Sequence, residues 1–329
     1  MAYSEKAQVA AEVTAHDADK PNLLGKNGCE SNNNAAKWYQ IFATQTKANG
    51  TGTDRTDANF PTKRTHDRHL HLISKPALVP GAFGYGIMFD LKADLAINGI
   101  VIAGHNFKDL SGTVNISVWV ANGNPFLGGD LPIRIAQWEG VTTSKRLVAL
   151  DLGQNHGTVT PGVGEGDWKE YTGVQWIQIA IRETGENAIV VPEVGEVLFS
   201  TRRQLSSRPN APFDDLHTRS EVNDFKPRSG VRVRYVRNTG QQVANLEFEP
   251  TGDDAYGLDD TITLKSWFKT DCDHGTLPGF WIPAPVTAVD DAYFMEMVEP
   301  DFDAPVRVVN RRRVPIEFEE IAPFVVKET

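Results

Sequence analysis

The feature that most limits the fold of this sequence is the alternation of aliphatic and polar residues within residues 88–120. Four aliphatic residues stand at every second position: Val114, Ile116, Val118 and Val120. This is the period of a β-strand with one buried face. The preceding run, residues 97–103, is too short and too rich in β-branched residues for a helix, and it predicts one well-buried strand. Two neighbouring strands of a β core are therefore expected here.

The composition favours a globular chain with two domains built from many short strands. At 329 residues the chain exceeds the usual size of a single domain. Its 40% hydrophobic and 23% charged residues are ordinary for a globular protein. The 28 glycines and 19 prolines are scattered, which is typical of short strands joined by turns. The predicted fold class is therefore mainly β.

The charge and the hydropathy exclude several classes of partner. A net charge of −10 argues against general nucleic-acid binding, because such a surface repels phosphates. No run approaches the ~18 apolar residues that span a bilayer, and residues 1–20 lack the apolar core of a signal peptide. We therefore expect no membrane contact, and folding in a cytoplasm. Cys29 and Cys272 are far apart and predict two reduced structural thiols.

A change of character at residues 191–213 predicts a domain boundary, because prolines and arginines gather there as in interdomain linkers. We place the boundary near Ser200. Residues 1–20 form an N-terminal arm, either docked or disordered. Residues 21–200 form the first β domain and residues 201–329 a second β-rich domain. In the second domain the sequence predicts two strands separated by an Asn-Thr-Gly turn at residues 238–240, and a helix after the capping pair Asp259 and Asp260.

No pattern in the sequence indicates catalysis or a bound metal. Motifs for nucleophilic, phosphate-binding and zinc-dependent chemistry are absent. The sequential aspartate pairs point to opposite sides of an extended chain, so they form no catalytic dyad. The aspartates within residues 253–260 could bind calcium through their oxygens, but they lack the EF-hand spacing. The alternative is that they act as turn or helix-cap residues. His66, His69 and His71 have no legible third ligand and indicate a polar strand edge. We predict no catalytic residue, no cofactor and no metal.

Three short patterns carry a resemblance to a known family. Phe89-Asp90-Leu91, residues 97–107 and Val118-Trp119 resemble the galactose-binding-like, or discoidin-like, β-sandwich found in virion proteins of tailed bacteriophages. Residues 275–285 and 314–320 resemble the C-terminal region of phage tail-tip proteins. The resemblance implies a jelly-roll sandwich over residues 21–200 and an assembly domain after it. Such a fold does not by itself imply sugar binding.

The resemblance implies a non-enzymatic structural component of a virion, assembled in the host cytoplasm. A tail-tip or baseplate protein would form a ring through contacts with copies of itself and with other virion proteins. In a closed ring, one face of a subunit must match a different face of the next. The alternatives are a carbohydrate-binding or host-adhesion module that binds a host-surface glycan, and a capsid decoration protein.

The residues that could serve these functions are few. Ligand contacts are expected on loops at the rim of the sandwich: His105, Asn106, Asn122 and Trp168. The alternative for Asn106 is that it ties its own turn. Assembly contacts are expected at the basic clusters, which could instead be solvated edges: Arg202, Arg203, Arg311, Arg312 and Arg313. The remaining tryptophans suit a core or an interface better than a sugar platform.

Overall fold

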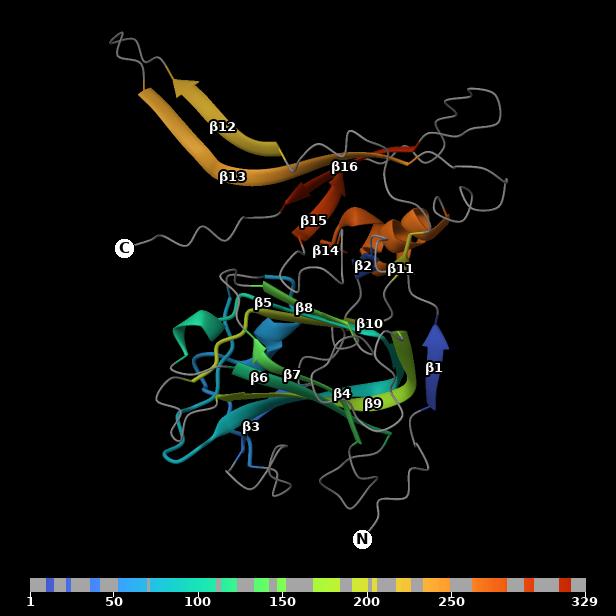
Figure 1. The fold of residues 1–329 in the computed structure, drawn as a ribbon. Coiled ribbons are helices and arrows are strands. Elements are labelled where there is room, and N and C mark those ends of the chain that lie inside the picture. The colour runs from blue at the N-terminus through green and yellow to red at the C-terminus, as the bar shows by residue number, and fades with distance from the viewer. Residues whose placement is uncertain are drawn as a thin grey trace. The chain divides into compact units, whose positions relative to one another are not determined.

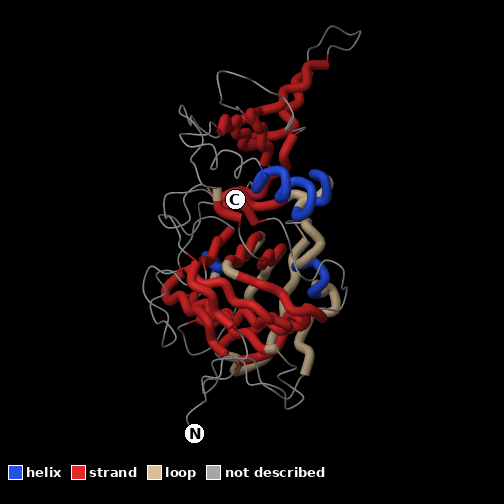
Figure 2. The backbone as a smooth tube through the Cα atoms, turned by 90° about the vertical axis from the view of Figure 1, so that its right-hand side faces the viewer, coloured by secondary structure: helices blue, strands red, loops and turns tan. Residues whose placement is uncertain are grey.

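The computed structural model describes the parts of the chain that form regular elements and the loops next to them. These are residues 10–14, 22–24, 36–41, 53–69, 72–110, 114–122, 133–141, 147–151, 168–183, 191–200, 203–205, 217–225, 233–248, 262–282, 293–298 and 314–320. Within them the structure is mainly β, as predicted (Figures 1 and 2). No helix in this part of the chain is long and apolar enough to cross a membrane.

Contacts divide the chain into two compact units. The first unit comprises residues 1–18, 26–202 and 285–292. The second comprises residues 19–25, 203–284 and 293–329. One of the crossings between the units, from Arg202 to Arg203, falls within residues 191–213, where the sequence predicts a linker. Strand β2 (Asn22–Leu24) lies in the sheet of the second unit, whereas the sequence placed it in the first domain.

The first unit contains a six-stranded antiparallel sheet. Its strands follow the order β3-β4-β9-β6-β7, and β1 pairs with β9 beside this path. The bounds are β1 (Ala10–Thr14), β3 (Ala36–Ile41), β4 (Gly84–Ile97), β6 (Val114–Ala121), β7 (Ile133–Val141) and β9 (Trp168–Glu183). Strand β1 falls in the predicted N-terminal arm and pairs with residues 168–172 of the same chain.

A second, three-stranded sheet completes the first unit as a sandwich. It has the order β10-β5-β8, formed by β5 (Gly99–Ala103), β8 (Leu147–Asp151) and β10 (Glu196–Ser200). Both sheets contribute to one core, in which the Phe89 ring of the first sheet meets the Phe199 ring of the second edge-on at 4.9 Å between centroids. The predicted β-sandwich is therefore confirmed.

The alternation of the sequence explains which face of each strand enters this core. In β6 the predicted set Val114, Ile116, Val118 and Val120 is buried, and in β9 the set Ile177, Ile179 and Ile181 is buried in the same core. Full burial of one such side chain contributes roughly 1.5–3 kcal/mol. The regular spacing of aliphatic residues thus specifies both the strands and their registers.

The run of residues 97–103 differs from its prediction. Its residues are buried as expected, but they do not form one strand. Ile97 ends β4 in the larger sheet, Asn98 interrupts the pairing, and β5 begins at Gly99 in the smaller sheet. The Asn-Gly pair is a turn signal that carries the chain from one sheet to the other.

The second unit contains a seven-stranded antiparallel sheet and a short helical segment. Its order is β11-β2-β14-β15-β16-β13-β12. The strands other than β2 are β11 (Arg203–Gln204), β12 (His217–Phe225), β13 (Val233–Phe248), β14 (Gly279–Ile282), β15 (Tyr293–Val298) and β16 (Val314–Glu320). Residues 262–266 are α-helical and continue as the π-helix η3 (Trp267–Asp271) before η4 (Asp273–Gly275), so the predicted helix is confirmed.

The core of the second unit is aromatic and contains the buried Cys272. Trp267, Trp281 and Phe318 pack their rings together there: Phe318 meets Trp267 at 5.8 Å and Trp281 at 5.3 Å between centroids, both nearly edge-to-face. Such aromatic pairs stabilise a core beyond the area they bury.

The predicted turn at residues 238–240 is wrong, because β13 runs through these residues without a break. On the partner strand β12, Arg219 stands opposite Gln241 and Glu221 stands opposite Asn238. β13 therefore fits one more residue than β12 into this interval, which is a β-bulge. The bulge accommodates the Asn-Thr-Gly sequence that in isolation favours a turn.

Candidate binding surface at the rim of the sandwich

A long connection between β3 and β4 builds one surface of the first unit. Residues 55–60 run beside residues 74–77, joined by backbone hydrogen bonds such as Asp57 N–H to Lys75 C=O at 3.1 Å and Ala77 N–H to Arg55 C=O at 2.7 Å. The short 3₁₀-helix η1 (Thr62–Thr65) follows. The connection is thus a structured element that holds its side chains in place.

Trp38 and Ser74 fasten this connection to the sandwich. The Trp38 indole, which is fully buried, donates its Nε1–H to Ser74 Oγ at 2.9 Å. Ser74 Oγ in turn donates to the Phe60 carbonyl at 3.2 Å. The Ser74 backbone exchanges two hydrogen bonds with Val194, at 2.7 and 2.9 Å. Strand β3, the long connection and residues 191–195 are therefore joined through one buried serine.

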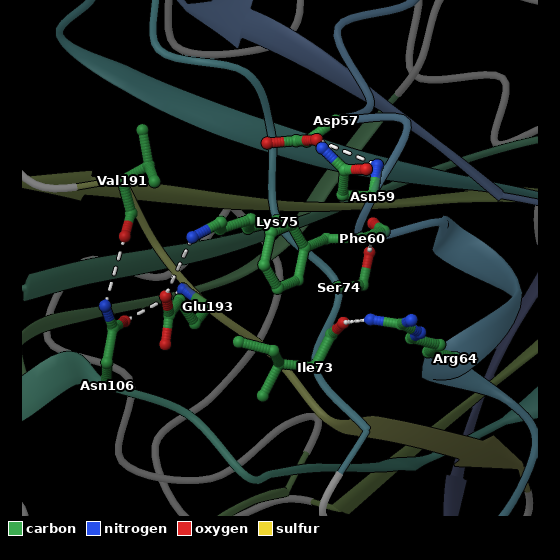
Figure 3. Close-up of polar contacts among 10 residues, drawn as sticks. All are labelled: Asp57, Asn59, Phe60, Arg64, Ile73, Ser74, Lys75, Asn106, Val191 and Glu193. Carbon is green, nitrogen blue, oxygen red and sulfur yellow. Dashed lines mark hydrogen bonds and ion pairs between the residues drawn. The ribbon is translucent and has the colours of Figure 1, made fainter.

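His105 and Asn106, two of the predicted ligand contacts, are buried in the turn that follows β5. His105 is 1% exposed; its Nδ1 accepts the Phe107 backbone N–H at 3.3 Å and its ring stacks on Phe107 at 4.0 Å. Asn106 is 7% exposed; it donates to the Val191 carbonyl at 3.1 Å and accepts the Glu193 N–H at 2.8 Å (Figure 3). Asn106 thus ties its turn to another segment rather than to itself.

Four partly exposed residues of this region lie close together: Phe60, Arg64, Lys75 and Glu193, which we call the Phe60 surface (Figure 3). The Lys75 Nζ lies 4.1 Å from the centroid of the half-buried Phe60 ring, and the Arg64 guanidinium carbon lies 5.7 Å from it. Glu193 Oε1 accepts from Lys75 Nζ at 3.4 Å. Arg64 also donates to the Ile73 carbonyl at 3.0 Å. An aromatic face and both signs of charge meet here.

One tyrosine of β3 and one of β4 are buried. Burial, with a smaller contribution from Asp54, raises the pKa of Tyr39 to about 12. Burial also raises the pKa of Tyr85, against the opposing effects of the Val79 hydrogen bond and of Arg55. The Tyr85 hydroxyl accepts the Val79 backbone N–H at 2.8 Å. Both phenols therefore stay protonated at neutral pH and act as structural groups.

Asn122 and Trp168, the other predicted ligand contacts, lie elsewhere on the sandwich. Asn122 is half-buried and follows β6, where Ala121 stands opposite Trp176 of β9. Trp168 begins β9, opposite Thr14 of β1. The Asn122 side chain lies beside Gly173 of β9, where an added Cβ would meet its Oδ1 at 3.8 Å. A strand rises ~3.3 Å per residue, so the five residues between Gly173 and Trp168 span roughly 17 Å of β9. One small ligand does not span both positions, and their role in binding stays a prediction.

Arg203 is the only one of the five predicted assembly arginines that falls among the described residues. It lies in the second unit and forms a two-pronged pair with Asp271, with Nε–Oδ2 at 2.5 Å and Nη2–Oδ1 at 3.1 Å. The hydrogen bond with Asp271 raises the pKa of Arg203. Arg203 thus anchors β11 to the helical segment. The other four fall outside the described residues: Arg202, Arg311, Arg312 and Arg313.

Sequence reasoning missed the Phe60 surface because its members are distant along the chain. Lys75 and Glu193 are 118 positions apart, and Asn106 and Glu193 are 87 apart. The one available signal was the density of cationic residues around a phenylalanine in residues 55–75 of an acidic chain. Among the described residues, no group of three or more histidine, cysteine or acidic side chains could hold a metal ion.

Replacing Asn106 by alanine is expected to destabilise the turn by roughly 2–3 kcal/mol, because it leaves the Glu193 N–H and the Val191 carbonyl without their partner. Urea denaturation would measure the cost, and amide exchange at residues 191–195 would localise it. Asn59→Ala is the matched control: Asn59 is exposed and contacts Asp57 through its backbone. We expect that control to change stability by less than about 0.5 kcal/mol. Equal costs would contradict a structural role for Asn106.

Comparison with known proteins finds only distant structural likenesses. No family model and no curated protein matches the chain. Chitosan-binding module 1 of the Paenibacillus sp. IK-5 chitosanase/glucanase, as a mutant, is 10% identical, with a TM-score of 0.34 over 54% of this chain and 99% of that one. A Ruminococcus gnavus GH29 fucosidase is 11% identical, with a TM-score of 0.33 over 54% of this chain and 27% of that one.

A fucose-binding module of Streptococcus pneumoniae, SpX-3, is 14% identical, with a TM-score of 0.28 over 44% of this chain and 88% of that one. Two of these three structures are binding modules, one is an enzyme, and none is a virion protein. With identities below 15% and TM-scores below 0.5, these likenesses carry no conclusion about function, and the sandwich rests on the sheets and shared core described above.

Proposed function

We propose that this chain is a non-catalytic binding protein whose first unit binds a carbohydrate through the Phe60 surface. The observation that carries the proposal is the half-buried Phe60 ring, with Lys75 Nζ at 4.1 Å and the Arg64 guanidinium carbon at 5.7 Å from its centroid, on a connection that backbone hydrogen bonds fasten to the sandwich. An aromatic ring offers an apolar face to the C–H groups of a sugar, while charged groups around it bond to hydroxyls.

The framework around Phe60 supports such a role because it is formed before any ligand arrives. Ser74 fixes the connection to Trp38 and to the backbone of Val194, and Asn106 fixes the neighbouring residues Val191 and Glu193. Binding sites commonly lie on loops that a rigid scaffold positions. A site that is already ordered loses little conformational entropy on binding, which favours affinity for a small ligand.

The local charge suggests the class of sugar. Residues 53–69 and 72–76 contain five basic and three acidic side chains, although the whole chain carries a net charge of −10. Two of the basic groups, Arg64 and Lys75, lie at the Phe60 ring, and among the described residues only Lys75 is paired with an acid there. A neutral or acidic saccharide therefore suits this surface better than a cationic one.

Titration calorimetry of the full chain with fucose, chitotriose and an acidic oligosaccharide would test the proposal. We expect binding of fucose or the acidic sugar, weaker binding of the cationic chitotriose, and a loss of about tenfold or more in affinity for Phe60→Ala. Leu78→Ala is the control, because Leu78 is an apolar residue of the same unit that is 59% exposed and lies outside the Phe60 surface. Unchanged binding by Phe60→Ala, or no binding by the natural chain, contradicts the proposal.

A structural component of a phage virion is the second candidate. Two observations favour it: the resemblance of residues 97–107 and 314–320 to virion proteins, and the two-stranded extension of the second unit formed by β12 and β13. In this role the chain would form a ring at a tail tip or baseplate, or decorate a capsid, with copies of itself and other virion proteins as partners. Electron microscopy of labelled particles would distinguish these locations, and absence of the chain from particles would exclude the role.

A further inference from the structure

Part of the sheet in the second unit is only two strands wide. Strand β16 pairs with residues 243–248 of β13, whereas β12 pairs with residues 233–243. Among the described residues, residues 233–242 of β13 therefore have β12 as their only neighbouring strand. We call β12 together with residues 233–242 the ribbon. Figure 1 shows the ribbon continuing beyond the end of β16.

A ribbon of this kind is poorly stabilised by itself. An isolated two-stranded hairpin is at best marginally stable in water, and stable sheets need three or more strands or a packed face. Among the described residues no strand pairs with either outer edge of the ribbon, that of β12 or that of residues 233–242. Such edges present rows of backbone N–H and C=O groups that another strand can pair with. The ribbon thus has two edges suited to strand addition.

The two strands of the ribbon differ in charge. Strand β12 carries Glu221 and Asp224 together with Arg219, whereas residues 233–242 carry Arg234 and Arg237 and no acidic residue. Within the chain, Asp224 already stands opposite Arg234. Arg237 has no residue opposite it, because the register shifts between Glu221, opposite Asn238, and Val222, opposite Val236. By sequence, β12 therefore carries a net charge of −1 and residues 233–242 a net charge of +2, so the two strands have opposite charge.

We propose that the ribbon is an interface between copies of this chain, in which the free edge of β12 in one copy pairs with the free edge of residues 233–242 in the next. The sheet then continues from subunit to subunit. The occupant is a second copy because one ribbon carries both complementary edges. Such a contact is heterologous, so it generates a closed ring or an open filament. The interface does not depend on carbohydrate binding by the first unit.

Sedimentation velocity of the full chain, without sugar, tests the interface. We expect self-association that rises with protein concentration and weakens at high salt, because the complementary charges are screened. Arg237→Glu and Glu221→Lys should each weaken association about tenfold or more. Both leave the opposition of Asp224 and Arg234 within the chain intact. Lys269→Glu is the control, an exposed charge of the same unit on η3, and it should associate like the natural chain.

An equal mixture of Arg237→Glu and Glu221→Lys should restore association, because the lysine edge of one variant meets the glutamate edge of the other. Circular dichroism and thermal unfolding of each variant confirm that the fold is kept. A natural chain that stays monomeric at about 100 μM in low salt overturns the proposal. So do variants that associate as the natural chain does, and a mixture that fails to restore association. Because no sugar is present, these outcomes leave the carbohydrate proposal to its own test.

Discussion

Replacing Trp38 by alanine is expected to lower the free energy of unfolding of the first unit by about 3–5 kcal/mol. Trp38 is fully buried on β3, opposite Ile87 of β4, and its removal leaves a large cavity in the shared core. It also leaves Ser74 without the indole N–H that it accepts. Since whole domains are stable by only about 5–15 kcal/mol, this single change removes a large fraction of the total.

Two further substitutions separate the causes of that loss. Trp38→Phe keeps most of the buried ring and removes the hydrogen bond to Ser74, so it should cost clearly less than the alanine substitution. Leu78→Ala removes an exposed leucine and should cost less than about 0.5 kcal/mol. Urea denaturation of the full chain, with hydrogen exchange at β4 and β9, would measure all three. If the alanine and phenylalanine variants are equally stable, the packing argument fails.

How far the fold follows from sequence depends on whether the signal is local. The alternation of Ile177, Ile179 and Ile181 predicts a strand and its buried face, because the period of two is a property of the strand itself. Whether a strand ends at an Asn-Gly or Asn-Thr-Gly pair is decided by its neighbours. Ile97 and Gly99 enter different sheets across Asn98, whereas β13 passes through residues 238–240 because β12 pairs on both sides of them.

The candidate site shows the same distinction more sharply. The Gly-His-Asn turn after β5 predicts ligand contacts because it ends a buried strand at the rim. In the structure His105 and Asn106 are buried, and their hydrogen bonds hold backbone segments together. The Phe60 surface, which Asn106 contacts through the Glu193 N–H, depends on Phe60, Lys75 and Glu193, which meet only after folding. A sequence pattern can mark where a strand stops, whereas the side chains gathered around that point come from connections without any period.

Replacing Phe318 by alanine should destabilise the second unit about as strongly as the loss of Trp38 destabilises the first, by roughly 3–5 kcal/mol. Phe318 is fully buried on β16 and packs edge-to-face with Trp267 and Trp281. It stands opposite Ala244 of β13, so it connects the aromatic core to the strand that continues into the ribbon. Amide exchange should rise at β14, β15 and β16 while β4 and β9 keep their protection.

This substitution also distinguishes two ways of losing self-association. Phe318→Ala should weaken association by destabilising the sheet from which the ribbon extends, and its unfolding midpoint should fall at the same time. Arg237→Glu should weaken association with the midpoint unchanged, because Arg237 has no residue opposite it within the chain. Phe318→Leu, which keeps an apolar side chain at the centre of the core, should lie between the natural chain and the alanine variant in both measurements. If Phe318→Ala associates normally despite a lowered midpoint, the ribbon does not depend on this core, and the link between β16 and the interface is wrong.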